Sequence, residues 1–284
     1  MSGPCRGSGR LPRIIVGNDD SYLSKGLYLL YESVKHLGEA RIYSTLWPRS
    51  AVGHTVSFNK PLRMNLVRHA GYEVYVVDGS PVDALHLAIA AHGFVPDLVV
   101  SGVNVGENLS MQHILYSGTI AVAVEAALMG IPAIAFSADV HLWEEFEDER
   151  LASLVKAVAG GLAKLVLERG LPRGVDLLSV NFPSPDNIRG CVRLSRAARR
   201  RWRPDFERRL DTRGRPYYWL QPIPLSPEPG SDVYAVVAEG CVSITPLHVD
   251  MNAPLSREAE EEIRAMARIV EEEALKALEG GQHS

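Results

Sequence analysis

The sequence contains few cysteines and lacks an apolar run long enough to cross a membrane. Of its 284 residues only three are cysteines, Cys5, Cys191 and Cys241, which are odd in number and far apart. They indicate neither a disulfide framework nor a cysteine-based zinc site. The longest apolar run, "TIAVAVEAALMGIPAIAF", is interrupted by Glu125 and Pro132, whereas a membrane span needs about 20 apolar residues. We therefore expect a protein of the reducing cytoplasm that does not enter a membrane.

A strong charge of either sign is also missing. The formal net charge is -4, which is too small to indicate nucleic acid or an acidic membrane as a partner. The hydrophobic content of 46% is ample for a buried core, which excludes disorder as the main state. Residues 1–12, "MSGPCRGSGRLP", have no apolar core of signal-peptide length. We expect them to form a flexible tail.

Short apolar strands alternate with helical segments from residue 13 to about residue 185. The expected strands are "RIIVG", "ARIYST", "YEVYVVD", "PDLVVSG", "IPAIAFS" and "VDLLSVNFP". Segments such as "SKGLYLLYESVKHLG" and "PVDALHLAIAAHG" have the pattern of helices. The alternation predicts an α/β fold with a mostly parallel sheet and helices on both faces. In such sheets ligands bind beyond the carboxyl ends of the strands.

The composition changes after residue 185. Positions 189 to 215 carry 11 arginines against three acidic residues, and "DVYAVVAEGCVSITPL" then has the pattern of strands. The last segment predicts an amphipathic helix that begins after Ser256 and ends at Gly280. Its apolar stripe consists of Ile263, Met266, Val270, Ala274 and Ala277. We expect residues 186–284 to be a C-terminal extension, with a basic-aromatic hairpin, strands and this helix, that packs on the 13–185 core and on a partner subunit.

Polar loops follow three of the expected strands. "NDDS" contains Asp19 and Asp20, "WPRSAVGHTVS" contains Ser50, and "SGVNVGENLS" contains Asn104. Their side chains are oxygen donors, which suit Mg2+ or Mn2+ better than zinc. Each loop alone is more often a turn. Only their convergence at one edge of the sheet favours a metal site.

Ser117, Gly118 and Thr119 stand where a helix should begin. Such a start caps a helix, and its N–H groups and hydroxyls can also bind an anion at the positive end of the helix dipole. A helix cap alone is the more common case. A metal ion beside an anion pocket would predict phosphoryl chemistry.

The order and spacing of these stretches resemble the SurE family of metal-dependent nucleotidases and acid phosphatases. The resemblance runs from Ile14 to about Pro246 and rests on "IIVGNDDSYLSKG", "WPRSAVGHTVS", "VDGSPVDALHL", "PDLVVSGVNVGENL", "YSGTIAVAVEAALMGIPAIAFS", "LLSVNFP" and "VSITPL". It implies a Rossmann-like sheet, hydrolysis of nucleoside monophosphates with 5' or 3' preference open, one divalent cation per subunit, and a homodimer or homotetramer.

The resemblance also implies a role for each polar residue. The implied metal ligands are Asp19, Asp20, Ser50 and Asn104, of which Asp19, Asp20 and Asn104 are also the expected catalytic residues. The implied phosphate contacts are Asn108, Ser117, Gly118 and Thr119. Attack by metal-activated water is favoured, because a ligating carboxylate has its oxygens engaged; an aspartyl-phosphate on Asp19 or Asp20 stays open.

This sequence departs from the family pattern in the loops. Ser21 replaces the usual glycine, and a backbone with positive φ there would be strained by serine. "GSPVDA" replaces "GTPADC", and Glu107 alters a loop that is usually richer in glycine. These changes keep the expected ligands and bear on loop shape and substrate preference.

Other functions fit the sequence less well. A receiver-like domain would need a phospho-acceptor aspartate after "DLVVSG", and a dinucleotide-binding enzyme would need G-x-G-x-x-G where "GNDDSY" stands. The non-enzymatic alternative is a nucleic-acid or polyphosphate binder that uses the arginine-rich 189–215 stretch. We expect nucleic acid not to be the main partner, since arginines on a solvated or subunit-facing hairpin are the usual case.

Overall fold

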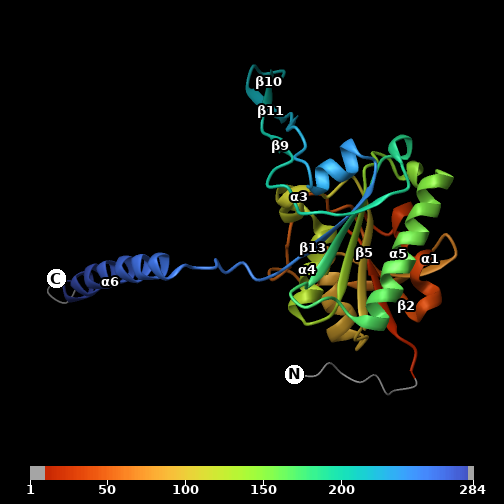
Figure 1. Cartoon of the computed structure of the whole chain (residues 1–284), viewed down its shortest axis with the longest axis horizontal. Coiled ribbons are helices and arrows are strands. Elements are labelled where there is room, and N and C mark those ends of the chain that lie inside the picture. Colours follow the sequence, from red (N-terminus) through yellow and green to blue (C-terminus); the bar gives the residue numbers. More distant parts are fainter. Residues whose placement is uncertain (1–9, 281–284) are drawn as a thin grey trace. The chain divides into compact units, whose positions relative to one another are not determined.

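The computed structural model describes residues 10–280, and the side chains of residues 10–274. The chain divides into two compact units, Met1–Val249 and Asp250–Ser284. Figure 1 shows a sheet wrapped by helices in the first unit and a single long helix in the second. Residues 1–9 of the expected tail, and the side chain of Ala277 in the expected apolar stripe, lie outside the described part.

A nine-stranded sheet forms the centre of the first unit. Its strand order is β3-β4-β2-β1-β5-β6-β7-β13-β8. The strands are β1 (Arg13–Gly17), β2 (Glu39–Thr45), β3 (Met64–His69), β4 (Tyr72–Val77), β5 (Leu98–Val105), β6 (Ala133–Ala138), β7 (Leu177–Phe182), β8 (Val192–Leu194) and β13 (Val242–Leu247). Within this sheet the β3–β4 and β13–β7 pairs are antiparallel, and the other neighbouring pairs are parallel. The mostly parallel α/β sheet is confirmed, and β8 and β13 extend it beyond the expected core boundary near residue 185.

The strand order reverses at β1. From β1 the chain goes to β2 on one side, and β5 later pairs with the other side of β1. In open α/β sheets this reversal opens a crevice at the carboxyl ends of the two neighbouring strands. The loops after β1 and β5 therefore meet at this crevice.

Helices cover both faces of the sheet, as expected. The helices of the first unit are α1 (Lys25–Val34), α2 (Pro81–His86), α3 (Ser110–Tyr116), α4 (Gly118–Leu128) and α5 (Glu149–Arg169), with short turns of helix at η1 (Lys35–Leu37), η2 (Leu87–Ala91), η3 (Trp143–Glu147), η4 (Pro185–Asn187) and η5 (Tyr234–Ala238). One buried cluster joins α1 and α5 to the sheet, and a second joins α2 and α4 to it. None of the helices that the structure describes is long and apolar enough to cross a membrane.

Local sequence signals explain where these helices begin. Before α2, the Ser80 hydroxyl accepts a hydrogen bond from the Asp83 N–H at 3.1 Å, and the Asp83 carboxylate accepts one from the Ser80 N–H at 2.7 Å. This reciprocal pair satisfies two N–H groups that a helix start leaves without partners. Ser117 caps α4 with a single hydrogen bond, which its hydroxyl accepts from the Ile120 N–H at 3.1 Å. The cap fixes the start of α4 at the crevice.

The basic-aromatic stretch forms an arm, defined here as residues 202–224. β10 (Phe206–Leu210) and β11 (Pro216–Leu220) make an antiparallel hairpin, and β9 (Trp202–Arg203) pairs with β12 (Ile223–Pro224) at its base. The hairpin projects from the sheet (Figure 1). Its register pairs Phe206 with Leu220, and both side chains are about half exposed. The expected hairpin is thus present and presents apolar side chains to its surroundings.

The second unit contains α6 (Arg257–Gly280), the expected terminal helix. The Ser256 hydroxyl accepts a hydrogen bond from the Ala259 N–H at 3.1 Å, so Ser256 is the expected N-cap. Ile263, Met266 and Val270 of the apolar stripe are each at least half exposed. The described part of the stripe is therefore open to solvent.

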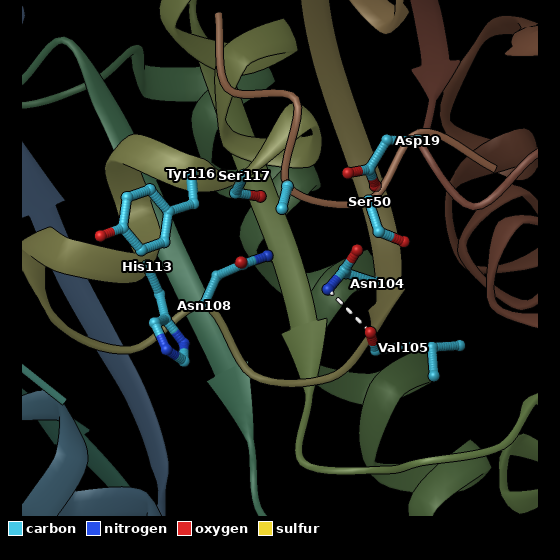
Figure 2. Close-up of a pocket in the computed structure, with 9 residues that line it drawn as sticks. Asp19, Ser50, Asn104, Val105, Asn108, His113, Tyr116 and Ser117 are labelled. Atoms are coloured by element: carbon cyan, nitrogen blue, oxygen red, sulfur yellow. Dashed lines mark hydrogen bonds between the residues drawn. The ribbon is translucent and has the colours of Figure 1, made fainter. Parts of the chain in front are cut away.

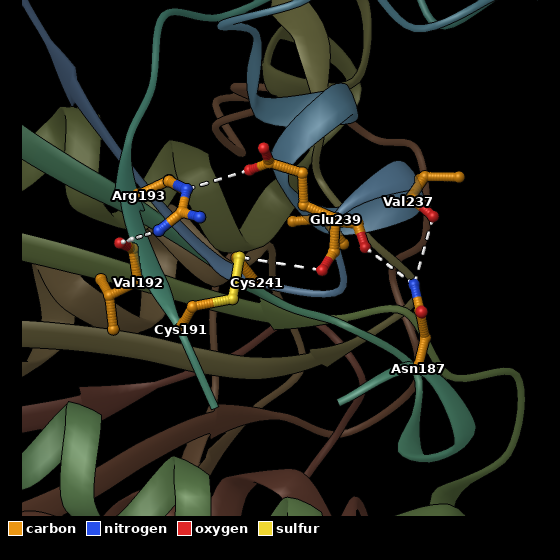
Figure 3. The surroundings of a disulfide bond; sticks show 8 residues. Asn187, Cys191, Val192, Arg193, Val237, Glu239 and Cys241 are labelled. Atoms are coloured by element: carbon orange, nitrogen blue, oxygen red, sulfur yellow. Dashed lines mark hydrogen bonds and ion pairs between the residues drawn. A yellow bond between two sulfur atoms is a disulfide. The ribbon is translucent and has the colours of Figure 1, made fainter. Parts of the chain in front are cut away.

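Cys191 and Cys241 form a disulfide (Figure 3), and this corrects the sequence analysis, which found no disulfide framework. β8 and β13 run parallel with Val192 opposite Val242. The residues that precede these two are therefore neighbours, with Cα atoms 4.7 Å apart. A spacing of 50 residues gives no hint of this pairing, because tertiary structure alone brings the strands together. The cysteine argument for a reducing compartment loses its basis, and the cytoplasmic location stays a prediction.

The disulfide generates a test of stability. It closes a loop over a sequence separation of 50 residues, and restricting the unfolded chain over such a loop is worth about 4 kcal/mol. A Cys191→Ala/Cys241→Ala variant should lose up to this amount in free energy of unfolding, measured by denaturant titration without reductant. Dithiothreitol should lower the midpoint of the unsubstituted protein and leave that of the double variant unchanged. Equal midpoints in all four samples would show that the bond does not form.

Candidate active site

The two aspartates lie in a tight turn after β1. Asn18 shapes this turn: its side-chain N–H donates to the Ser21 carbonyl at 2.8 Å, and its amide oxygen accepts from the Ser44 hydroxyl at 2.6 Å. Ser21 has φ of 71°, which is the left-handed conformation that favours glycine. The family's glycine therefore has a physical reason, and this chain carries serine there at some cost in backbone strain. The turn lets adjacent aspartates reach one site.

Asp19 sits on the start of α4. Asp19 is 3% exposed. Burial raises the pKa of Asp19, although hydrogen bonds from the Thr119 hydroxyl and from the backbone of Asp19, Thr119 and Gly118 act to lower it. A Cβ atom on Gly118 would lie 2.8 Å from Asp19 Oδ2, so only glycine allows this approach. The first N–H groups of α4 thus hold Asp19 in place.

Asp20 points toward β5. Its Oδ2 accepts a hydrogen bond from the Val105 N–H at 2.8 Å, and the residue is 7% exposed. Burial, and then the charge of Asp19, raise the pKa of Asp20 from 3.8 to about 7. Two carboxylates buried side by side repel each other, and a divalent cation would remove that repulsion and keep both ionised.

Asn104 and Ser50 bring neutral oxygens to the same place. The Asn104 side-chain N–H group donates to the carbonyls of Val105 and Gly106 at 3.0 and 2.7 Å. Its Oδ1 lies 3.3 Å from the Thr119 hydroxyl, beside Asp19. Figure 2 shows Asp19, Ser50 and Asn104 on one side of a pocket. Two carboxylates, one amide oxygen and one hydroxyl form a donor set that suits a hard cation such as Mg2+ or Mn2+.

A cavity of about 190 Å³ adjoins these groups. It is lined by Asp19, Ser50, Ala51, Asn104, Val105, Asn108, His113, Tyr116 and Ser117. The structure thus brings five of the residues expected from the sequence to one cavity. Asp20, Gly118 and Thr119 do not line it. The Thr119 hydroxyl donates to Asp19 and the residue is fully buried, so this side chain orients a carboxylate rather than facing the cavity.

Asn108 and Ser117 are the polar residues on the opposite wall. The Asn108 side-chain amide donates one of its two N–H bonds to the Ser137 hydroxyl at 2.8 Å, and its second N–H bond can donate to an anion. Its backbone N–H donates to the Asn181 side chain at 2.8 Å. Ser117 accepts the cap hydrogen bond of α4, so its own hydroxyl proton is available to a ligand. Both can contact an anion in the cavity.

His113 and Tyr116 of α3 form an aromatic end of the cavity (Figure 2), which the sequence did not reveal as a unit. Behind them, the Trp202 indole N–H donates to His113 Nε2 at 2.7 Å. Glu107 pairs with both His113 Nδ1, at 2.7 Å, and Arg201 Nε, at 2.8 Å. The Glu107 carboxylate is therefore compensated and does not present free negative charge to a phosphate. Arg201 and Trp202 lie far along the chain, so only the fold brings them here.

No group of three or more His, Cys, Asp and Glu side chains in the described part of the chain has the geometry of a metal site. The candidate set here combines two aspartates with a hydroxyl and an amide.

Residues 14–204 match the sequence profile of the family described as "Survival protein SurE". The chain belongs to the SurE family. The protein named 5'-nucleotidase SurE from Pyrobaculum arsenaticum is 42% identical over 259 residues, which cover 91% of this chain and 97% of that one. The one from Hyperthermus butylicus is 45% identical over 242 residues, covering 84% and 86%. The crystal structure of the SurE protein from Aquifex aeolicus matches with a TM-score of 0.73 and 33% identity, over 90% of this chain and all of that one. The resemblance seen in the sequence is confirmed.

The raised pKa of Asp20 predicts how the stability of the metal-free protein depends on pH. With a pKa of about 7 in the fold and an ordinary value of 3.8, the native state retains a proton that the unfolded state has lost. Stability should therefore fall as pH rises from about 4 to about 7. Asp20→Asn mimics the protonated form, so its melting temperature in EDTA should fall less over this range. Asp186→Asn, at an exposed carboxylate, should follow the unsubstituted protein; parallel profiles for all three proteins would contradict this assignment.

Proposed function

We propose that this protein is a metal-dependent phosphomonoesterase that hydrolyses nucleoside monophosphates, a 5'-nucleotidase like its named relatives. The observation that carries the proposal is the pair of buried carboxylates, Asp19 and Asp20, with Asn104 and Ser50 beside them at the strand-order reversal. Burying these two negative charges without a compensating positive charge would cost free energy. Its repulsion, together with the oxygen-only donor set, supports one divalent cation per subunit, Mg2+ or Mn2+.

Each residue then has a defined task. A bound cation lowers the pKa of water and polarises a phosphoryl oxygen. Asp19, Asp20, Ser50 and Asn104 hold that ion, and Asn108 and Ser117 orient the phosphate from the opposite wall. The oxygens of Asp19 are already engaged by Thr119 and the start of α4. This supports Asp19 as a ligand rather than as a nucleophile, and hence attack by water.

The shape of the cavity supports a nucleotide as the substrate. Ser117 and Tyr116 both line the cavity, so the phosphate contact and an aromatic ring belong to the same cavity. Tyr116 is 45% exposed although it lines the cavity. Base stacking on such a ring tolerates every nucleobase. A nucleoside monophosphate would place its phosphate at the polar end and its base near His113 and Tyr116.

The C-terminal extension supports assembly into a homodimer or homotetramer. The arm exposes apolar side chains on its hairpin, and α6 exposes its apolar stripe. Five arginines of the 189–215 stretch form ion pairs with carboxylates: Arg193, Arg196, Arg201, Arg209 and Arg215. Such pairing leaves less positive charge for a nucleic-acid backbone, so the binder alternative is not favoured. We place the enzyme in the cytoplasm.

The reaction class is tested by phosphate release. Protein stripped with EDTA and reloaded with Mg2+ or Mn2+ should release phosphate from nucleoside monophosphates. Asp19→Asn and Asp20→Asn should fold, bind Mn2+ more weakly and lose most activity, because each removes a charged ligand. A reloaded protein that is folded yet inactive on every phosphomonoester would refute the proposal, and salt-dependent oligonucleotide binding without turnover would favour the binder.

The different positions of Thr119 and Ser117 give a sharper prediction. Thr119→Val removes the hydroxyl that orients Asp19, so Mn2+ binding by calorimetry should weaken about tenfold, and turnover should fall with it. Ser117→Gly removes the cavity-facing hydroxyl, and because glycine is tolerated as an N-cap at little cost, the start of α4 is kept. Its kcat/KM should fall about tenfold, as for a hydrogen bond to a charged group, while Mn2+ affinity stays unchanged. Equal Mn2+ affinity in both variants would show that Thr119 does not act through the metal ligand.

A further inference from the structure

A carboxylate outside the cavity bridges two histidines. Glu125 lies on α4. One of its carboxylate oxygens lies 2.7 Å from His54 Nε2, and the other lies 2.8 Å from His86 Nε2. His54 belongs to the 46–63 loop that carries Ser50, and His86 ends α2. The bridge therefore joins three separate segments. It lacks the geometry of a metal site, as do all other such groups in the described residues.

Glu125 depends on these two partners. The Glu125 side chain is 17% exposed, on a helix whose other residues are small or apolar. Burial raises the pKa of Glu125, but the hydrogen bonds from His86 and His54 outweigh burial and hold that pKa below its usual range. A mostly buried carboxylate that loses such partners is strongly destabilising. The Glu125 carboxylate thus stays ionised next to the Ser50 loop, with one histidine hydrogen-bonded to each of its oxygens.

The Ser50 loop has few other anchors near the proposed ligand. On one side, the Arg49 N–H donates to the Asp19 carbonyl at 2.7 Å; on the other, the Gly53 N–H donates to the Tyr116 carbonyl at 2.8 Å. Ala51 and Gly53 have φ of 56° and 59°, so the chain winds back sharply here. Residues 51–53 have no polar side chain. His54 is therefore the first side chain after Ser50 that can fix the loop by a hydrogen bond.

We propose that the His54–Glu125–His86 bridge is a positioning device that holds the Ser50 hydroxyl at the cation. The three residues do not touch the substrate; they act through Ser50. The bridge fastens the loop to α4, the helix whose start holds Asp19. One rigid helix thereby places two ligands of the proposed ion, Asp19 directly and Ser50 through the bridge. This inference rests on the proposed metal site.

The experiment is a double-mutant cycle with Mn2+ binding as its readout. His54→Ala should weaken Mn2+ binding about tenfold, which is the usual effect of losing a group that orients a metal ligand. In a Ser50→Ala background the same change should have little further effect, because the ligand that it positions is already gone. Glu125→Gln should resemble His54→Ala, and His54→Gln, which keeps a hydrogen-bond donor, should recover part of the affinity. The Mn2+-dependent rise in melting temperature gives an independent measure.

His248→Ala is the matched control. His248 also pairs with a carboxylate, Asp176 at 3.0 Å, but not on a loop of the site, so Mn2+ affinity should be unchanged. A His54→Ala protein that binds Mn2+ as tightly as the unsubstituted chain would overturn the inference. Equal losses with and without Ser50 would also overturn it, because His54 would then act independently of that ligand. If the unsubstituted protein itself binds no Mn2+ or Mg2+, the metal site fails instead, and with it the proposed function.

Discussion

Repulsion between two neighbouring carboxylates is the constraint on which this structure depends. Asp19 and Asp20 are buried where the central strand β1 ends. Neither is paired with a lysine or arginine in the ion pairs that the described residues form. The fold instead surrounds them with hydrogen-bond donors. The start of α4 and the Thr119 hydroxyl donate to Asp19, and a backbone N–H of β5 donates to Asp20. These hydrogen bonds compensate only part of the negative charge of the two carboxylates, and a divalent cation would neutralise the rest.

The neighbouring loops follow from the same constraint. Because β1 lies between β2 and β5, the segments after these three strands reach one crevice. Each brings a different kind of oxygen: carboxylates after β1, a hydroxyl after β2 and an amide from the end of β5. The cavity beside them has polar groups on two walls and aromatic rings at one end. The proposed sites for an ion and for a phosphate ester would thus both be consequences of one topological position.

The sequence predicted the features that depend on neighbouring residues. Apolar runs and helical periodicity revealed the parallel sheet, and "NDDS", placed directly after a strand, revealed the carboxylate pair. Features that depend on distant residues were not predictable. The hydroxyl of Thr119 was expected at the phosphate, yet its position 100 residues after Asp19 gives no sign that it orients that carboxylate. The Glu107–Arg201 pair and the Cys191–Cys241 bond likewise join segments whose adjacency only the folded sheet creates.

The disulfide also has a topological consequence. The arm and its flanking segments lie wholly between Cys191 and Cys241, so they form one covalently closed loop. A protease that cuts the exposed hairpin opens this loop but releases neither piece. The two fragments stay joined at the edge of the sheet, with β8 and β13 still paired, and separate in size only after reduction. The exposed arm can thus be cleaved while the chain that builds the crevice stays in one covalent molecule.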